Sequence, residues 1–277
     1  MLHDELAFAA DLARKSGEIA LEVYDADHGV QLKGAADPVT IADTRINAFV
    51  VEALRARFPG DGIVAEESAD HGDALTAERC WFVDPLDGTK EFIAKNGEFA
   101  IMLGLAIGGR AQLGVVYQPV TDTLYCGVVG AGASLERGGQ TRALSVSQTA
   151  EPSALRLVVS RSHRSQETDL VIRGLGVTSE QPCGSVGLKV GLIAEQRADL
   201  YVHMSGHASR WDSCGPEAIL RAAGGRFTDL LGREISYRSA RMKNASGILA
   251  CNAAAYDAVL PVVSAVARAA GLDGASS

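Results

Sequence analysis

Residues 81–93 read W-F-V-D-P-L-D-G-T-K-E-F-I and combine several structural signals in one short stretch. The apolar run before Asp84 predicts a buried strand. Pro85 is expected to end the pairing of that strand, because proline has no backbone N–H to donate. Asp87 follows three residues after Asp84, so the two carboxylates flank a tight turn and can face the same point.

The rest of this stretch supplies further oxygen and nitrogen groups. The carbonyl of Leu86 lies between the two acids, and hard divalent cations such as magnesium prefer oxygen ligands of this kind. Gly88 and Thr89 are expected to open a short helix that ends at Gly97, so their backbone N–H groups are suited to hold a phosphate oxygen. Taken alone, the stretch also fits an ordinary turn, because Asp, Pro and Gly are common turn residues.

Two amphipathic helices are expected before this stretch. Apolar residues recur at helical spacing over residues 2–24, and again from Ile46 to Phe58, where Pro59-Gly60 ends the pattern. Asp43 stands just before the second apolar stripe begins. The first part of the chain therefore predicts helices followed by the strand that carries Asp84.

The residues after position 100 predict several strands and then an alternation of strands and helices. Antiparallel strands are expected at residues 101–107, 113–118 and 124–129. The later elements are expected as strands at 155–159 and 200–204 and as helices at 186–196 and 213–223. Pro216 fits the last helix if it lies in the opening turn. This α+β pattern has a soft boundary near Thr149 to Pro152, which predicts a part at 1–150 with most metal ligands and a part at 151–277 that completes the site and its substrate pocket.

Composition and charge narrow the classes of partner. Hydrophobic residues make up 47% of the 277 residues, enough for a sizeable core. The formal net charge is −8 and no basic stretch is present, which argues against a nucleic-acid polymer as partner. A small phosphorylated ligand is still compatible with an acidic chain if metal ions supply positive charge locally.

The cysteines and the apolar runs predict a cytoplasmic protein. The five cysteines are widely spaced and include no C-x-x-C pair, so neither a zinc site nor a disulfide framework is expected. The start of the chain lacks the basic region of a signal peptide, and no apolar run reaches membrane-spanning length. We therefore expect a reducing compartment and no membrane span; a homodimer is one assembly that the sequence permits.

Three more segments place acidic residues beside structural signals. They are Asp37-Pro38-Val39-Thr40-Ile41-Ala42-Asp43, Ala65-Glu66-Glu67-Ser68 and Arg210-Trp211-Asp212-Ser213. Each has a plain explanation on its own, a helix N-cap for the first and third and a solvated loop for the second. Their joint occurrence in this order, around D-P-L-D-G-T, is much harder to attribute to chance.

Together these segments resemble the lithium-sensitive, magnesium-dependent phosphatases, a superfamily that includes inositol monophosphatase, fructose-1,6-bisphosphatase and the 3′(2′),5′-bisphosphate nucleotidases. The resemblance runs from P-V-T-x-A-D through E-E-S, W-x-V-D-P-L-D-G-T and W-D to G-G-x-x-T-D-x-x-G at Gly224 to Gly232. It covers nearly the whole chain, and D-P-L-D-G-T is its most specific part. It implies a layered αβαβα sandwich and hydrolysis of a small phosphate monoester.

The resemblance also implies two or three Mg²⁺ ions and their ligands. The first ion is expected to take oxygen atoms from Glu66, Asp84 and the Leu86 carbonyl. The second is expected to take them from Asp84, Asp87 and Asp212, while Glu67 assists a third, weaker ion. Catalysis is then expected from water activated at this centre, which Thr89, hydrogen-bonded to Asp43, positions and helps to deprotonate.

Three places favour the nucleotidase branch, whose substrate is adenosine 3′,5′-bisphosphate. Lys90-Glu91-Phe92-Ile93 follows D-G-T, Val159 to His163 resembles an S-R-S-H segment, and Gly184 to Lys189 resembles G-S-x-x-L-K. The positive charge of Lys189 is expected to bind a second phosphate of the substrate, one that lies away from the metals. The expected substrate contacts are Leu86, Asp87, Gly88, Thr89, Ser160, His163, Ser185, Lys189 and Asp212. Plainer roles stay open for two of them, a solvated helix position for Lys189 and a loop cap for His163.

Other functions within and outside this superfamily stay open at this point. The stretch before Trp211 lacks the glutamate that inositol-specific members place ahead of the aspartate, yet it matches the nucleotidases only loosely. Inositol phosphate, fructose bisphosphate and histidinol phosphate are alternative substrates. A non-catalytic metal- or phosphate-binding module is the alternative of a different class. His203 and His207 are not expected to bind zinc, because no H-E-x-x-H pattern accompanies them.

Overall fold

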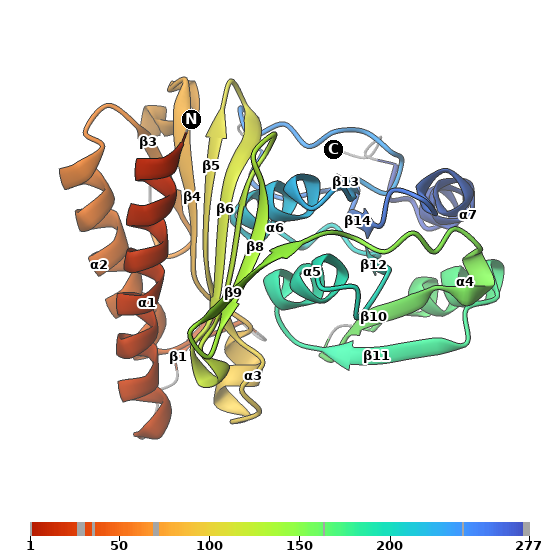
Figure 1. Ribbon diagram of the computed structural model, residues 1–277, viewed down its shortest axis with the longest axis horizontal. Helices are drawn as coiled ribbons and strands as arrows, with labels where there is room; N and C mark the ends of the chain where they lie inside the picture. Colours follow the sequence, from red (N-terminus) through yellow and green to blue (C-terminus); the bar gives the residue numbers. More distant parts are fainter. Residues whose placement is uncertain are drawn as a thin grey trace.

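The computed structural model describes residues 2–26, 31–34, 37–68, 72–162, 164–239 and 241–273, with the side chains of 31–34 and of 37 and 38 left out. Five layers of secondary structure follow one another from left to right in Figure 1. Helices α1 (His3–Asp25) and α2 (Ile41–Arg57) form the outer layer on one side, and α4 (Gln166–Leu175) and α7 (Tyr256–Ala269) form that on the other. Two β-sheets enclose a middle layer of two helices. The expected αβαβα sandwich is confirmed.

The larger sheet has seven strands in the order β3-β4-β5-β6-β7-β8-β9. Strand β3 pairs in parallel with β4, and every later pair is antiparallel. The strands are β3 (Gly62–Ala65), β4 (Arg79–Asp87), β5 (Ala100–Ile107), β6 (Arg110–Gln118), β7 (Thr123–Val128), β8 (Gly132–Arg137) and β9 (Gln140–Leu144). The three antiparallel strands expected between residues 101 and 129 are therefore confirmed.

The smaller sheet has five strands in the order β11-β10-β12-β14-β13. Its β11, β10 and β12 are parallel, whereas β14 is antiparallel to both β12 and β13. The strands are β10 (Arg156–Ser160), β11 (Ser179–Cys183), β12 (Leu200–His203), β13 (Arg226–Thr228) and β14 (Ile248–Cys251). A separate two-stranded ribbon pairs β1 (Gln31–Gly34) with β2 (Asp37–Val39).

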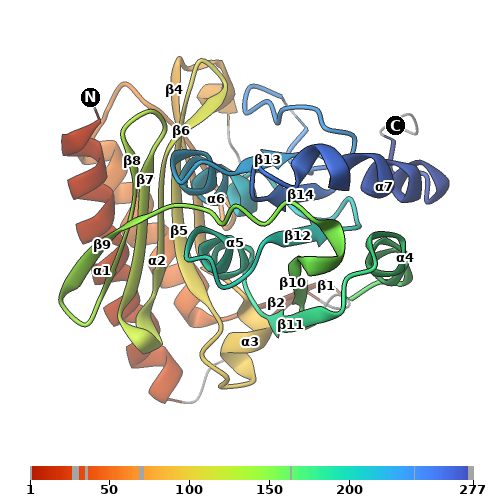
Figure 2. The same cartoon turned by 45° about the vertical axis from the view of Figure 1, so that its right-hand side comes forward.

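Helices α5 (Val186–Ala194) and α6 (Trp211–Ala222) fill the space between the two sheets and lie side by side (Figure 2). Helix α6 comes from the second half of the chain but packs on β5 and β6 of the first half. One core cluster of buried side chains accordingly joins both sheets and both middle helices. None of the helices formed by the described residues is long and apolar enough to cross a lipid bilayer.

Glycines set how closely α6 approaches the larger sheet. A Cβ at Gly114 would lie 2.0 Å from the backbone oxygen of Gly215, and one at Gly104 would lie 2.5 Å from the Gly215 nitrogen. On the opposite face, a Cβ at Gly17 of α1 would lie 2.4 Å from the Tyr117 ring. Gly17, an unfavourable residue inside a helix, is thus explained by packing. The backbone of α6 therefore rests directly on the sheet.

Three local expectations need correction. Strand β4 does not end at Asp84 but continues to Asp87, because a bulge between these residues absorbs Pro85 and lets Asp87 pair with Ala100. The short helix after it, α3 (Thr89–Ile93), ends four residues before Gly97.

Helix α6 also begins two residues earlier than expected. Pro216 consequently lies in the second turn, where it removes the backbone bond to Asp212 but still fits the helix.

The glycine seam under α6 predicts that Gly114→Ala lowers the free energy of unfolding by about 1–3 kcal/mol, because a backbone oxygen cannot move aside for the methyl group. Gly60→Ala is the matched control, since no heavy atom lies within 4 Å of its added Cβ. Chemical denaturation of both variants measures the difference. Equal stabilities would show that the sheet and α6 can separate without cost.

Candidate active site

The bulge in β4 places two carboxylates where the larger sheet meets the middle helices. Asp84 is 1% exposed, and its Oδ1 accepts a hydrogen bond from the Leu86 N–H at 3.0 Å. The Oδ2 of Asp87 accepts from Ser185 Oγ at 2.5 Å and from the Gly187 N–H at 3.1 Å. Asp87 thus ties the end of β4 to the start of α5, and Ser185 caps that helix by accepting from Leu188 N–H.

Asp212 reaches the same region from the first turn of α6. Its Oδ2 accepts a hydrogen bond from the Ser209 N–H at 2.5 Å, and its negative charge acts on the carboxyl group of Asp84. Asp212 is not the N-cap of α6, since that position is Arg210. The plain N-cap explanation therefore does not account for this acid, which faces the carboxylates of β4.

Burial and mutual repulsion act on these acids together. Burial raises the pKa of Asp84 well above its ordinary value, and the charges of Glu66, Asp87 and Asp212 raise it further. Burial, followed by repulsion from Asp87, raises the pKa of Asp212 to about 6. Acids that raise one another's pKa in this way lie close together. The structure therefore brings together Glu66, Asp84, Asp87 and Asp212 from three separate segments, the residues after β3, strand β4 and helix α6.

The chemistry of these donors fits a hard divalent cation. All are carboxylates, the Leu86 carbonyl lies between two of them, and positive charge would relieve their repulsion. As they stand, the described residues include no three His, Cys, Asp or Glu side chains grouped to enclose a metal ion. Asp84, Asp87 and Asp212 each accept hydrogen bonds from protein N–H or O–H groups. Metal binding would exchange those donors for the cation.

Asp43 and Thr89 meet beside this cluster. Thr40 is the N-cap of α2, and its backbone N–H and side-chain hydroxyl both donate to Asp43 Oδ2, at 2.8 and 2.6 Å. The other oxygen, Oδ1, lies 3.3 Å from the Thr89 hydroxyl, which is also 3.3 Å from the Leu86 carbonyl. Asp43 therefore closes a capping box and still presents one oxygen to Thr89. The expected hydrogen bond between Thr89 and Asp43 is present.

A pocket of about 160 Å³ opens next to Asp87 and collects most of the expected substrate contacts. Among the residues expected to bind substrate, those that line it are Asp87, Gly88, Thr89, Ser160, Ser185 and Lys189. Leu86 and Asp212 do not line it and belong to the carboxylate cluster instead. His163 lies outside the described residues.

Lys189 is not the solvated helix residue that the sequence left open. It is 3% exposed, its Nζ lies 3.4 Å from the Cys183 carbonyl oxygen, and it lies 5.1 Å from the centroid of the Tyr201 ring. Burial lowers its pKa, while the charge of Asp87 opposes that change. The charge of Lys189 therefore acts on the acid cluster as well as on the pocket. Lys189 lies closer to the expected metal ligands than the sequence suggested.

Several lining residues are not among the expected substrate contacts, and they include Glu91, Ser162, Tyr201 and His203. The Glu91 carboxylate accepts from Ser162 Oγ at 2.5 Å, which joins α3 to the loop after β10. His203 is bonded to Tyr201 on one ring nitrogen and to Ser205 on the other, at 3.3 and 2.8 Å. Period-two alternation along β12 was the available signal, because it places Tyr201 and His203 on the same face.

Comparison with known proteins gives a consistent relationship. The inositol monophosphatase family matches residues 1–266. The 3′(2′),5′-bisphosphate nucleotidase CysQ of Escherichia coli K12 is 35% identical over 229 residues, 82% of this chain and 91% of that protein. Inositol monophosphatase 1 of Solanum lycopersicum is 32% identical, over 87% of this chain and 90% of that protein.

A solved structure extends the relationship to the fold. CysQ from Bacteroides thetaiotaomicron, described as a bacterial member of the inositol monophosphatase family, superposes with a TM-score of 0.76. It is 29% identical, and the match covers 90% of this chain and 97% of that one. The chain belongs to the inositol monophosphatase family.

Proposed function

We propose that this chain is a magnesium-dependent phosphatase that removes the 3′-phosphate of adenosine 3′,5′-bisphosphate, giving AMP and phosphate. The observation that carries the proposal is the position of the acid cluster, which adjoins a pocket with a buried lysine. The inositol monophosphatase family is metal-dependent. The E. coli relative named as a 3′(2′),5′-bisphosphate nucleotidase supports the choice of substrate.

The acid cluster would hold the metal ions. Glu66, Asp84 and the Leu86 carbonyl would hold one, and Asp84, Asp87 and Asp212 a second, with Glu67 near a third. Bound Mg²⁺ supplies positive charge that activates water and stabilises charge on the phosphoryl oxygens. Asp84 is shared, so it would fix the two ions relative to each other.

Thr89 and Asp43 would prepare the attacking water. The Thr89 hydroxyl lies between the Asp43 carboxylate and the Leu86 carbonyl, so it can accept a proton from water only as it donates its own to Asp43. Burial raises the pKa of Asp43, which makes this carboxylate a better proton acceptor. The two hydrogen bonds from Thr40 to Asp43 Oδ2 keep Oδ1 turned towards Thr89.

Lys189 and its neighbours would select the substrate. A buried ammonium group beside a pocket favours a ligand with a further negative charge, and a second phosphate provides it. Tyr201 and His203 offer flat rings in the same pocket, which suit the base of a nucleotide. These residues distinguish a bisphosphate nucleotide from a simple phosphate monoester.

An inositol or sugar phosphate is the second candidate substrate. The Solanum lycopersicum relative named as an inositol monophosphatase supports it. The aromatic and cationic lining of the pocket favours the nucleotide instead. A non-catalytic module is disfavoured because the whole carboxylate set is present and its members lie together.

We also propose a cytoplasmic location. All five cysteines are free and buried, which suits a reducing compartment. A homodimer stays a prediction from the sequence.

The pocket predicts a substrate preference that depends on Lys189. With Mg²⁺, the chain should hydrolyse adenosine 3′,5′-bisphosphate with a higher kcat/KM than 3′-AMP, inositol 1-phosphate, fructose 1,6-bisphosphate or histidinol phosphate. Lys189→Met should raise KM for the bisphosphate about tenfold or more while changing that for 3′-AMP much less, because one charge-assisted contact is lost. Phosphate release measures both constants.

Lys15→Met is the control for that experiment, since Lys15 is an exposed residue of α1 paired with Asp11. A wild-type preference for inositol phosphate would overturn the choice of substrate. If Lys189→Met raises KM by the same factor for the bisphosphate and for 3′-AMP, Lys189 does not have the assigned role. Release of phosphate without Mg²⁺ would contradict the metal-dependent mechanism.

The contact between Thr89 and Asp43 predicts that removing the Thr89 hydroxyl lowers kcat and leaves KM almost unchanged. Thr89→Ala should lower kcat about 100-fold with little change in KM, because the hydroxyl acts on water during the reaction. Thr89→Ser keeps the hydroxyl and should retain most of the activity. If the alanine and serine variants turn over equally fast, Thr89 has no part in proton transfer.

A further inference from the structure

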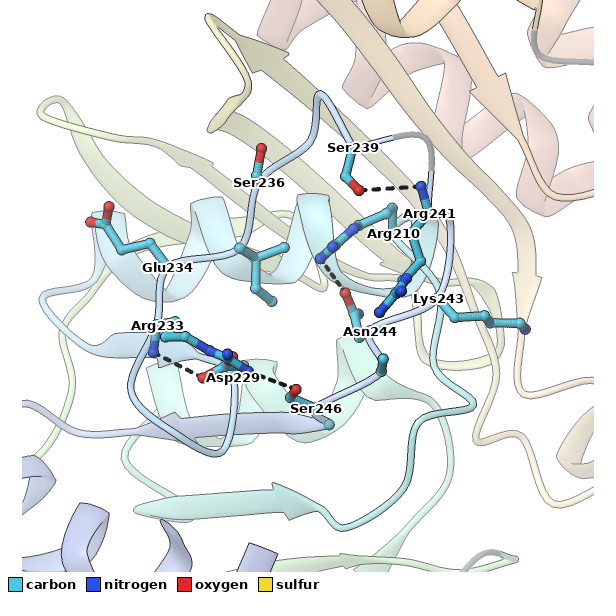
Figure 3. A pocket seen from close by; sticks show the side chains of 13 residues that line it. Arg210, Asp229, Arg233, Glu234, Ser236, Ser239, Arg241, Lys243, Asn244 and Ser246 are labelled. Carbon is cyan, nitrogen blue, oxygen red and sulfur yellow. Dashed lines mark hydrogen bonds and ion pairs between the residues drawn. The ribbon is translucent and has the colours of Figure 1, made fainter. Parts of the chain in front are cut away.

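The pocket beside Asp87 and a larger pocket beside the start of α6 differ in how their walls are held together. The larger pocket has a volume of about 320 Å³, and Figure 3 shows its side chains. There Arg233 Nε donates to the Asp229 carboxylate at 2.6 Å, and the two residues are only four positions apart in one loop. At the edge of the pocket beside Asp87, in contrast, one carboxylate joins segments that are far apart in the sequence. That carboxylate belongs to Glu98.

Glu98 lies between α3 and β5, and its side chain binds two other segments. Arg161 donates from Nε to Glu98 Oε2 at 2.8 Å and from Nη2 to Oε1 at 2.6 Å. The Gly184 N–H donates to Oε2 at 2.6 Å. Arg161 follows Glu98 by 63 residues and Gly184 follows it by 86. One carboxylate therefore joins the connection before β5 to the loop after β10 and to the residues before α5.

The geometry of this contact distinguishes it from an ordinary surface ion pair. Exposed ion pairs contribute little to stability unless they are bidentate or belong to a network, and the contacts of Glu98 meet both conditions. The Glu98 side chain is 23% exposed. Burial acts to raise the pKa of Glu98, but the hydrogen bonds from Arg161 and Gly184 lower that pKa overall, so the carboxylate is ionised at neutral pH.

The backbone of Glu98 also packs against the pocket. A Cβ at Gly88 would lie 2.9 Å from the Glu98 carbonyl oxygen, and one at Gly184 would lie 2.6 Å from the same atom. Gly88 and Gly184 both line the pocket, whereas Glu98 is not among its lining residues. Glu98 therefore supports two parts of the pocket wall from behind.

Arg161 connects Glu98 to a third part of the wall. Ser160 and Ser162, its neighbours in sequence, both line the pocket. Ser162 Oγ also donates to the Glu91 carboxylate at 2.5 Å. The contact with Glu98 adds the link between this 160–162 segment and the start of α5, which lie on the same pocket.

We propose that Glu98 is a positioning residue for the substrate: it holds the 160–162 segment and the start of α5 at the spacing that a nucleoside bisphosphate requires, without touching the substrate itself. This inference rests on the proposed function, because it takes the nucleoside and its second phosphate to occupy this pocket. A pocket that is already ordered saves the free energy of ordering its walls when the ligand binds. Glu98 therefore acts on nucleotide binding and not on the chemical step at the acid cluster.

Steady-state kinetics of Glu98→Gln with Mg²⁺ test this proposal. Glutamine keeps the size of the side chain, but its amide nitrogen is a donor and cannot accept the hydrogen bonds that one carboxylate oxygen accepts now. KM for adenosine 3′,5′-bisphosphate should rise at least about fivefold while kcat stays within about twofold of the wild type, because the loosened segment must be ordered on binding. For inositol 1-phosphate, which lacks the nucleoside and the second phosphate, both constants should stay within about twofold.

Glu180→Gln is the matched control. The Glu180 carboxylate accepts from Arg164, another arginine of the loop after β10, at 3.1 Å. Neither Glu180 nor Arg164 lines the pocket. The control makes the same substitution in the same kind of contact with the same loop, so its kinetic constants should match those of the wild type.

A double-mutant cycle with Arg161→Gln shows whether the two residues act as a unit. Arg161→Gln should also raise KM for the bisphosphate, and the double variant should raise it no further than Glu98→Gln alone. The Arg161 side chain is 40% exposed, so this variant tests the same contact even if Glu98→Gln does not fold. Factors that multiply in the double variant would show that Glu98 does not act through Arg161 and would overturn the proposal.

The kinetics also separate failure of this inference from failure of the proposed function. If Glu98→Gln keeps the wild-type KM for the bisphosphate, the positioning role is wrong although the substrate is right. A fall in kcat on both substrates would place the effect of Glu98 at the acid cluster and would equally overturn the proposal. If the wild type hydrolyses inositol 1-phosphate with a higher kcat/KM than the bisphosphate, the proposed function is wrong, and so is this inference.

Discussion

Repulsion between buried carboxylates is the constraint on which this molecule depends. The charges of Glu66, Asp87 and Asp212 add to burial in raising the pKa of Asp84, and the charge of Asp87 adds to burial in raising the pKa of Asp212. Placing several negative charges together in the interior costs free energy, and proteins accept such a cost where a cation offsets it. The acid cluster is therefore the part of the fold that cannot be explained by packing alone.

The fold brings these acids together through a bulge in β4 and through close packing of α5 and α6 against the larger sheet. A bulge in β4 turns Asp84 and Asp87 towards the middle layer, and the hydrogen bonds from Ser185 and Gly187 anchor Asp87 to α5. The glycines of β5, β6 and α6 let the helix that carries Asp212 lie directly on the sheet. Pockets then open on either side, one beside Lys189 and one beside Arg210.

Much of the fold could be predicted from the sequence because its signals were local. Helical periodicity predicted α1 and α2, and the apolar runs predicted β4 to β7. The expected end of β4 at Pro85 was wrong because a bulge, a tertiary feature, accommodates the proline. Alternation along β12 could place Tyr201 and His203 on one face of the strand, but it could not show that this face lines the pocket, because that depends on how β12 pairs with β10 and β14.

The roles of the site residues rest on family resemblance more than on local pattern. Asp43 shows why, because its signal is that of a helix cap, and it does serve the cap of α2 while also contacting Thr89. Lys189 shows the converse, since a lysine in an apolar helix looks solvated until the fold buries it. The motifs predicted which residues belong to the site. Only the fold showed that one residue, such as Asp43, can both cap a helix and contact another residue of the site.

The claim that the acid cluster is built for cations is tested most directly by thermal unfolding of the wild type and of Asp84→Asn, each in EDTA and in Mg²⁺. Mg²⁺ at about one hundred times its Kd should raise the wild-type Tm by about 5 °C or more, as expected for a ligand that binds only the folded state. Asp84→Asn should show little of that rise and should be at least as stable as the wild type in EDTA, because it removes a buried negative charge. A wild-type Tm that does not respond to Mg²⁺, or an equal rise in both proteins, would contradict this account.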